Sequence, residues 1–223
     1  MLPAAAQVQY GANRYAIKAD IGYAHNTTYG SHAVFDIGAF MPITEHFEMQ
    51  ADLRFTTARN HSIGVQLRPK FAVPVGEMFL EGRLLTGLYP RDGYNDLTQA
   101  IAVGYRMEYV SVQVGFSTRL IMETPYDWHS NSNIIVEPFN VCYKIEAFVR
   151  PQTSPWNISL CVSNMTDYQI ERVWQLLFMA GGWYNIDEHW RIHLNALCKP
   201  TGMFHLNASY YGAEVRTGFT YNF

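Results

Sequence analysis

Two short stretches carry the residue types of a hydrolytic site, a hydroxyl nucleophile beside an imidazole base. His61 precedes Ser62, and the run WHSNSN places His129 beside Ser130 and Asn131. Such a site needs the hydroxyl and the imidazole within hydrogen-bond reach and a third polar group that orients the base. Neighbours in a polar loop do not meet this requirement, because such residues are common in solvated turns. The sequence therefore predicts no catalytic residue, and a hydrolase is kept only as a lesser alternative.

Metal and thiol chemistry has equally weak support in the sequence. The eight His and three Cys residues show no metal-ligand spacing, so no metal and no cofactor are expected. Cys142 and Cys161 fall on neighbouring predicted strands, opposite each other or two residues apart depending on the register. A cross-strand disulfide and two free thiols both fit this placement, and the free thiols are favoured.

Charged side chains at alternate positions of otherwise apolar segments are the remaining candidates. Lys18 and Asp20, for example, alternate with Ile17, Ala19 and Ile21. Assigning all such residues to one face gives nearly balanced numbers of cations and acids. With one histidine, this face holds Asp20, Asp36, Glu48, Asp52, Arg54, Arg68, Lys70, Glu81, Arg83, Arg106, Arg119, Lys144, Glu146, Arg191, His193, Glu214 and Arg216, and also Lys18 and Glu108.

The elements that position these residues are β-strands, because apolar and polar residues alternate with a period of two. The alternation recurs in residues 15–25, 33–41, 47–56, 63–73, 78–88, 97–107, 110–120, 134–148, 156–163, 173–184, 190–198 and 212–223. No segment has a convincing helical period, and no apolar run reaches the roughly 18 residues of a membrane-spanning helix. The sequence thus predicts an all-β protein of about twelve strands.

The composition favours a wall that faces lipid over a soluble sandwich or a lipocalin-like barrel. Charged residues make up 16% of the chain, against roughly 25% in ordinary soluble domains. The polar face carries Gly, Ala, Ser and Gln beside single charges, as a crowded interior would, instead of the many Lys and Glu of a solvated surface. The net charge of -3 gives no field that would attract nucleic acid, so no nucleic-acid partner is expected.

The connections between the predicted strands differ at the two ends. On the side of the chain termini they are short, such as ITEH, PVGE and NIDEH. On the other side several are longer and polar, such as YPRDGYND, METPYDWHSNSN and NMTDYQIER. Aromatic residues gather at strand ends, namely Phe47, Phe71, Trp156, Tyr184, Trp190, Tyr221 and Phe223. Unequal connections and aromatic girdles are expected of a barrel that crosses a membrane.

The last residues, GAEVRTGFTYNF, keep alternating to the end, with Phe219, Tyr221 and Phe223 on the apolar face. This strand resembles the C-terminal β-signal of bacterial outer-membrane β-barrel proteins, and the whole chain resembles that family. The resemblance implies one antiparallel up-and-down transmembrane β-barrel over residues 13–223, integral to the outer membrane of Gram-negative bacteria. It also implies two partners, the lipid bilayer and the barrel-assembly machinery that reads the last strand. Residues 1–12 are set apart, because their AAA run resembles the cleavage end of an export signal.

The charged inner face is compatible with more than one kind of lumen. Turn positions predict Asp52 opposite Arg68 and Lys70 opposite Glu81, a network that neutralises itself. The favoured hypothesis is a non-enzymatic barrel with a largely occluded lumen and a structural or partner-subunit role. A narrow porin-like channel for small solutes is the alternative, because about twelve strands lie between filled barrels of about eight and open channels of about sixteen. An outer-leaflet lipid hydrolase is the second alternative.

Overall fold

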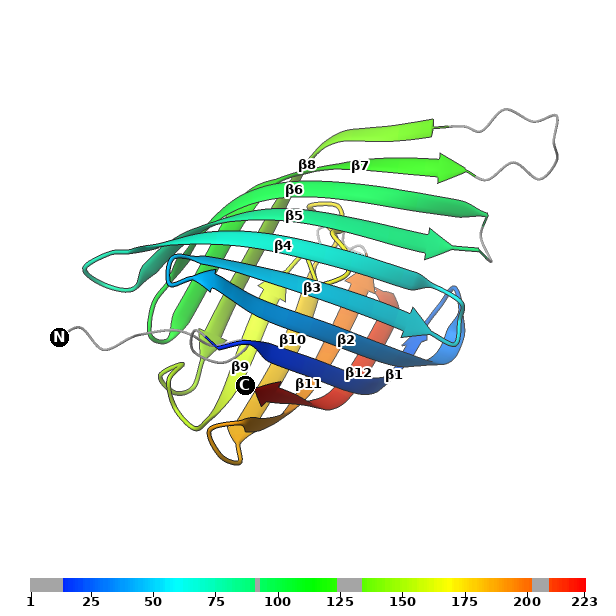
Figure 1. Cartoon of the computed structure of the whole chain (residues 1–223). Coiled ribbons are helices and arrows are strands. Elements are labelled where there is room, and N and C mark those ends of the chain that lie inside the picture. Colours follow the sequence, from blue (N-terminus) through cyan, green and yellow to red (C-terminus); the bar gives the residue numbers. More distant parts are fainter. Residues whose placement is uncertain (1–13, 91–92, 124–133, 202–208) are drawn as a thin grey trace.

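The protein is a closed antiparallel β-barrel (Figure 1). The computed structural model describes residues 14–90, 93–123, 134–201 and 209–223. Residues 1–12, which the sequence sets apart, and the WHSNSN run lie outside these ranges. The strands are β1 (Ala16–Asn26), β2 (Gly30–Thr44), β3 (Phe47–Thr56), β4 (His61–Ala72), β5 (Glu77–Tyr89), β6 (Tyr94–Arg106), β7 (Val110–Glu123), β8 (Ile134–Phe148), β9 (Trp156–Ser163), β10 (Leu177–Asn185), β11 (Trp190–Thr201) and β12 (Ser209–Asn222).

The strands follow one another around the wall in chain order, and β12 returns to β1. Ala16 pairs with Asn222 and Asn26 pairs with Gly212, so the first strand is paired along its whole length with the last. Closure leaves neither terminal strand with a free edge. The predicted fold, an all-β up-and-down barrel of twelve strands, is confirmed. We call the end where Ala16 meets Asn222 the terminal end, and the opposite end the loop end.

The wall is apolar outside and polar inside. In β4, Ile63 and Leu67 are exposed, whereas Gln66 and Arg68 are buried. The same pattern continues around the barrel, so that most buried residues are polar or charged and Ile101 remains 64% exposed. This arrangement is the reverse of a soluble protein, in which Lys, Arg, Asp and Glu are rarely buried. No helix among the described residues is long and apolar enough to cross a membrane.

Aromatic side chains form a belt near the terminal end. Tyr184 pairs with Trp156, and Trp190 pairs with Tyr221. The ring centroids of Trp190 and Tyr221 are 4.8 Å apart, and those of Tyr221 and Phe223 are 5.1 Å apart. The amide of Phe223 still donates to the carbonyl of Tyr15 at 2.9 Å. The final aromatic residue is therefore anchored to the wall and does not end a frayed tail.

Two predicted details of the strands are wrong. Strand β10 begins at Leu177 and not at Val173, because residues 173–176 complete the connection from β9. The turn after β3 lies two residues earlier than predicted, because the Thr56 hydroxyl and the backbone of Asn60 exchange hydrogen bonds of 3.0 and 3.1 Å. Arg59 takes a left-handed φ of 65° in this tight turn.

Candidate functional site in the barrel lumen

The charged residues that the alternation assigns to one face of the strands lie on the inner face of the wall, except Glu108. Asp36, Asp52 and Glu81 are each no more than 1% exposed. Burying so many charges is unfavourable unless each is paired and hydrogen-bonded. The lumen must therefore be understood through the ion pairs that these residues form.

The largest network runs across β3, β4 and β5. The Arg68 guanidinium donates to Glu48 at 2.8 Å and to Glu81 at 2.6 Å, and the second oxygen of Glu81 lies 2.7 Å from Arg83. Lys70 approaches the other oxygen of Glu48 at 3.0 Å. Glu81 is thus the acid shared by two buried guanidinium groups. Its removal would leave both without their main counter-charge.

A second network joins the two ends of the chain. Arg216 on β12 lies 2.6 Å from Asp36 on β2 and 2.9 Å from Glu214. Arg54 on β3 donates to both oxygens of Glu214 and lies 3.6 Å from Asp36. These pairs hold β12 against the first strands through the lumen as well as through the wall.

The predicted cross-strand partners are wrong, although the residues lie on the predicted face of their strands. Arg68 faces Glu48 on β3 instead of the predicted Asp52, and Lys70 faces Phe79 on β5 instead of the predicted Glu81. The two-residue shift of the turn after β3 accounts for part of the difference.

The set of inner charges also changes. Glu108 lies exposed in the turn between β6 and β7. Sequence reasoning missed charges that pair with inner cations or lie in the connection after β9. They are Glu77 with Arg106, Asp96 with Arg119, Glu171 with Lys199, and Asp167 near Lys18.

The connection between β9 and β10, residues 164–176, enters the lumen. We call it the inner loop. The amide of Glu171 donates to the carbonyl of Asn164 at 2.7 Å, and that of Thr166 donates to the carbonyl of Gln169 at 2.8 Å. These bonds close residues 164–171 into a hairpin. Its sequence predicts a solvated polar loop. In the structure the hairpin is buried, and Tyr168 is only 5% exposed.

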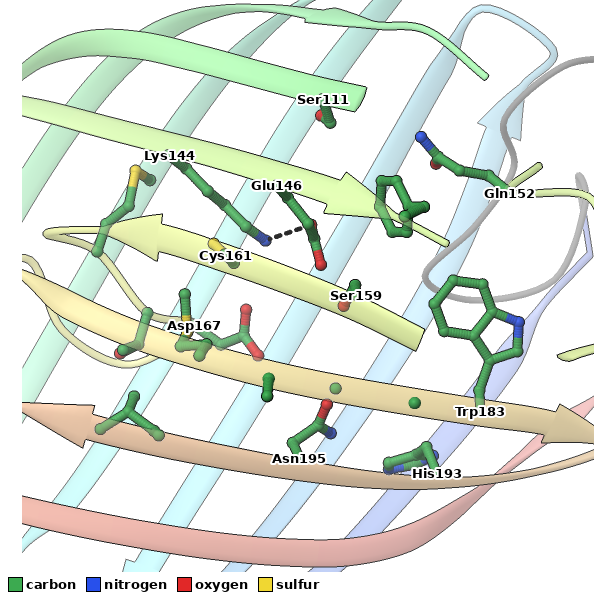
Figure 2. A pocket seen from close by; sticks show the side chains of 18 of the residues that line it. Ser111, Lys144, Glu146, Gln152, Ser159, Cys161, Asp167, Trp183, His193 and Asn195 are labelled. Carbon is green, nitrogen blue, oxygen red and sulfur yellow. Dashed lines mark ion pairs between the residues drawn. The ribbon is translucent and has the colours of Figure 1, made fainter. Parts of the chain in front are cut away.

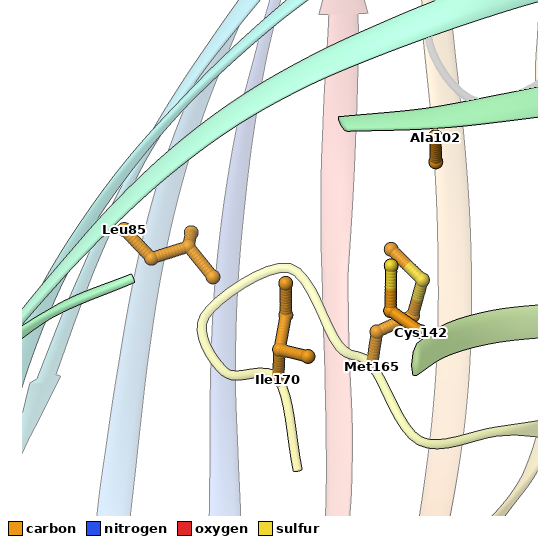
Figure 3. Packing of buried hydrophobic residues seen from close by; sticks show 5 residues of the cluster. All are labelled: Leu85, Ala102, Cys142, Met165 and Ile170. Carbon is orange, nitrogen blue, oxygen red and sulfur yellow. The ribbon is translucent and has the colours of Figure 1, made fainter. Parts of the chain in front are cut away.

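The apolar side chains of the hairpin occupy a recess on the inner wall. Met165 and Ile170 pack with Leu85, Ala102 and Cys142 from β5, β6 and β8 (Figure 3). Small residues at the inner positions of β6 and β8 leave the space that these two side chains fill. Met165 is 2% exposed, so the recess is closed over it.

Polar contacts fix the tip of the hairpin above the charged networks. The Arg83 guanidinium donates to the carbonyl of Thr166. The ring of Tyr168 lies under Arg54 and Arg216, whose guanidinium carbons are 5.1 and 5.8 Å from its centroid. Cations over an aromatic face are attracted by its quadrupole. The hairpin is thereby attached to the wall from several directions.

Asp167 places a negative charge on the hairpin, inside the lumen and near a cation of the wall. Its carboxylate lies 4.0 Å from the Lys18 ammonium. Burial by itself would raise the pKa of Asp167, but Lys18 and Arg216 act against it and leave the pKa below its ordinary value. Asp167 is therefore ionised at neutral pH and attracted to the wall.

A cavity of ≈ 170 Å³ remains on the terminal side of the hairpin (Figure 2). Met165, Thr166 and Asp167 line it from the loop end, and Gln152 and Trp183 line it near the terminal end. Its charged lining is mostly cationic, with Lys18, Arg68, Arg83, Arg106, Lys144, Arg191 and Arg216 against Glu146 and Asp167. Figure 2 shows Lys144 and Glu146 as an ion pair, at 3.3 Å, on one side of this space. Cations thus outnumber acids among the side chains that face the cavity, and most of these cations also pair with acids outside its lining.

The residues considered for hydrolysis do not come together. Ser62 is buried on the inner face, whereas the His61 ring packs beside Phe55, 5.6 Å between centroids. His129 lies outside the described residues. His193 pairs with Asp20 inside the lumen. No group of three or more potential metal ligands occurs among the residues that the structure describes.

The two inward cysteines are free thiols. Cys161 faces Glu146 across the β8–β9 pair, so it is four positions away from Cys142. Neither of the two predicted arrangements, opposite or two residues apart, is present.

Comparison with known proteins identifies the fold. The chain is similar to the translocator domain of the autotransporter NalP from Neisseria meningitidis, with a TM-score of 0.61 and 12% identity over 97% of this chain and 91% of that one. It is similar to an outer-membrane channel from Pseudomonas putida F1, with a TM-score of 0.58 and 11% identity over 100% of both chains. It is also similar to the NanC porin, with a TM-score of 0.54 and 7% identity over 92% of this chain and 100% of that one. No family model and no curated protein matches the sequence. The resemblance to outer-membrane β-barrels is confirmed at the level of the fold.

Proposed function

We propose that this protein is an integral outer-membrane barrel, without enzymatic activity, whose lumen is largely closed at rest by the inner loop. The observation that carries the proposal is the burial of the hairpin at residues 164–171 inside the barrel. An apolar outer wall with an aromatic belt supports placement in a lipid bilayer. The paired inner charges support a filled lumen, because each pair occupies space that an open pore would leave to water.

The direct test is single-channel recording of the unmodified protein in planar bilayers. The closed lumen predicts little or no steady conductance. A steady conductance of the size seen for open porins would contradict it. Insertion of the barrel is checked separately, by its heat-modifiable migration on gels.

The cationic cavity favours a second candidate, a narrow channel that passes small anionic solutes when the inner loop moves. Among the similar structures, the KdgM porin, at a TM-score of 0.50 and 12% identity over 92% of this chain and 99% of that one, is recorded with oligogalacturonate. That ligand is acidic, and a preference for acidic solutes is our proposal for this chain. It agrees with the excess of Lys and Arg around the cavity.

Charge substitution in the cavity should change ion selectivity. In any conducting state, Lys144→Glu is expected to lower the ratio of anion to cation permeability by about two-fold or more, because it reverses a charge that lines the path. Reversal potentials in a salt gradient measure the ratio. Arg150→Glu is the matched control, because Arg150 lies in an exposed turn and stacks on Trp156 outside the lumen. An equal shift in both variants would contradict a selectivity set by the cavity.

We also propose that the barrel-assembly machinery recognises the last strand through Phe219, Tyr221 and Phe223. Removing Phe223 should lower the yield of folded barrel in cells several-fold. Phe71→Ala is the matched control, because Phe71 is a similarly exposed aromatic residue, 52% against 61% for Phe223, and belongs to β4. Equal yields of heat-modifiable barrel from the two variants would contradict the recognition proposal.

A further inference from the structure

Among the described residues, the backbone pairing of the wall is interrupted beside β8. Strand β8 begins at Ile134, but its pairs with β9 extend only from Lys144 to Phe148. Among the described residues, 134–143 have no strand partner on this side, because β9 ends at Ser163 and the chain then enters the lumen. The gap lies at the loop end, where Figure 1 shows β8 extending away from β9.

Side chains close most of this gap, and the backbone amide of Asn164 also donates to the carbonyl of Tyr143 at 3.2 Å. The Asn164 amide donates to the carbonyl of Val141 at 2.7 Å and accepts from the amide of Tyr143 at 2.8 Å. Asn140 donates to the carbonyl of Glu171 at 2.6 Å and accepts from the amide of Val173 at 3.0 Å. We call this line of contacts the seam.

An ion pair lies in the part of the seam nearest the loop end. Arg172 on the inner loop donates to Glu137 on β8 at 2.8 Å, and its side chain is 55% exposed. The seam is therefore held by side chains and by the inner loop, without a ladder between two strands. Movement of the inner loop would open the seam without breaking any pairing between strands.

Apolar side chains lie on both sides of the β8 edge. Val136 and Phe139 face outward and are 55% and 65% exposed. Ile135 pairs with Ile121 on the lumen side and is 47% exposed. Past this edge lies the recess that Met165 and Ile170 now fill. Apolar side chains thus lie on both sides of the seam, and the polar residues Asn140, Asn164 and Glu171 lie between them.

A second strand could in principle pair with the same edge. Pro138 interrupts the edge and cannot donate a hydrogen bond, and the β7–β8 pairing shifts register beside it, between Ser117 and Arg119. Proline and a bulge are the features by which edge strands avoid added strands. The observations therefore favour a ligand that needs no ladder of hydrogen bonds.

From this juxtaposition we infer that the seam is a lateral entry site for a single-chain amphiphile from the outer part of the bilayer. Its hydrocarbon chain occupies the recess in place of Met165 and Ile170, and its polar head lies at the seam beside Arg172 and Asn140. Met165 and Ile170 fill the recess when the ligand is absent. The inference rests on the proposal that the barrel lies in lipid.

Photolabelling in phospholipid bilayers tests the inference. The probe is a long-chain fatty acid with a diazirine near the end of its chain, and labelled residues are identified by mass spectrometry. We expect labels on the lumen-facing residues Leu85 and Cys142 in addition to outer-face residues. Unlabelled fatty acid should remove the inner labels and leave the outer ones.

Matched variants separate recess binding from general contact with lipid. Met165→Ala with Ile170→Ala enlarges the recess and should raise the inner labelling several-fold. Leu84→Ala with Leu160→Ala, two residues exposed on the outer wall, should leave it unchanged. Ala102→Leu adds bulk to the recess and should lower it.

Four outcomes have distinct meanings. A folded, bilayer-inserted barrel labelled only on its outer face overturns the inference, as does cross-linking of two copies of the chain through residues 134–139. Inner labelling that does not respond to the recess variants also overturns it. Failure of the barrel to insert into bilayers would instead overturn the proposed outer-membrane location.

Discussion

Replacing residues 165–170 with an Asn-Gly turn is expected to convert a nearly closed lumen into a steadily conducting one. Asn164 and Glu171 are already joined by a backbone hydrogen bond of 2.7 Å, so a two-residue turn can connect them without moving β9 or β10. The change removes Met165, Tyr168 and Ile170 from the lumen and takes away the carbonyl that Arg83 now contacts. Single-channel conductance should rise by at least about ten-fold, because the main obstruction of the path is gone.

Two point variants of the inner loop test the same prediction at single residues. Tyr168→Ala removes the ring that lies under Arg54 and Arg216, and should give frequent openings. Gln169→Ala changes an exposed side chain of the same loop and should behave like the unmodified protein. If the shortened loop gives a folded barrel with unchanged conductance, the inner loop is not the element that closes the lumen.

Glu81→Gln is expected to be the most destabilising conservative substitution in the lumen. The carboxylate is 1% exposed and contacts two guanidinium groups, Arg68 at 2.6 Å and Arg83 at 2.7 Å. Removing one partner of a buried ion pair costs about 3–5 kcal/mol, because the charge that remains has neither water nor a counter-ion. We expect the free energy of unfolding to fall by an amount near the lower end of this range, since Gln keeps the shape of the side chain and one oxygen acceptor.

Urea unfolding in phospholipid vesicles, followed by tryptophan fluorescence, measures this loss. Glu45→Gln is the matched control, because the Glu45 side chain is 78% exposed and the His46 ring, 3.6 Å from its carboxylate, is exposed as well. It should leave the midpoint unchanged. The double variant Arg68→Gln with Glu81→Gln should lose less than the sum of the two single variants, because it removes both charges of one pair. Equal midpoints for Glu81→Gln and the unmodified protein would contradict the role given to the network.

The wall of the barrel could be predicted from the sequence almost residue by residue. Alternation alone placed β3, β8 and β9 at their observed bounds, because one face of each strand must be apolar to meet lipid and the other must carry the buried charges. The faces of the charged residues follow from the same rule. Their partners do not, because a shift of two residues in a turn changes every pairing across two strands while leaving each side chain on its own face.

The inner loop could not be predicted in the same way. Polar letters dominate NMTDYQIER, and such a run ordinarily indicates a solvated connection. The available signal was indirect and lay elsewhere in the chain. Ala100, Ala102, Gly115 and Cys142 occupy inner positions of β6, β7 and β8, and small residues side by side inside a barrel leave room that something else must fill.

Ion pairing in the lumen also has a consequence for how the barrel is assembled. Arg216 and Asp36 are separated by 180 residues in the sequence, and His193 and Asp20 are separated by 173. Arg216 on β12 and His193 on β11 reach these carboxylates only when the last two strands are in place, so the carboxylates keep part of their hydration while the sheet is still open. Dehydration of the interior and joining of the two ends are then a single cooperative step, and an incomplete chain would keep a wet, unsealed sheet.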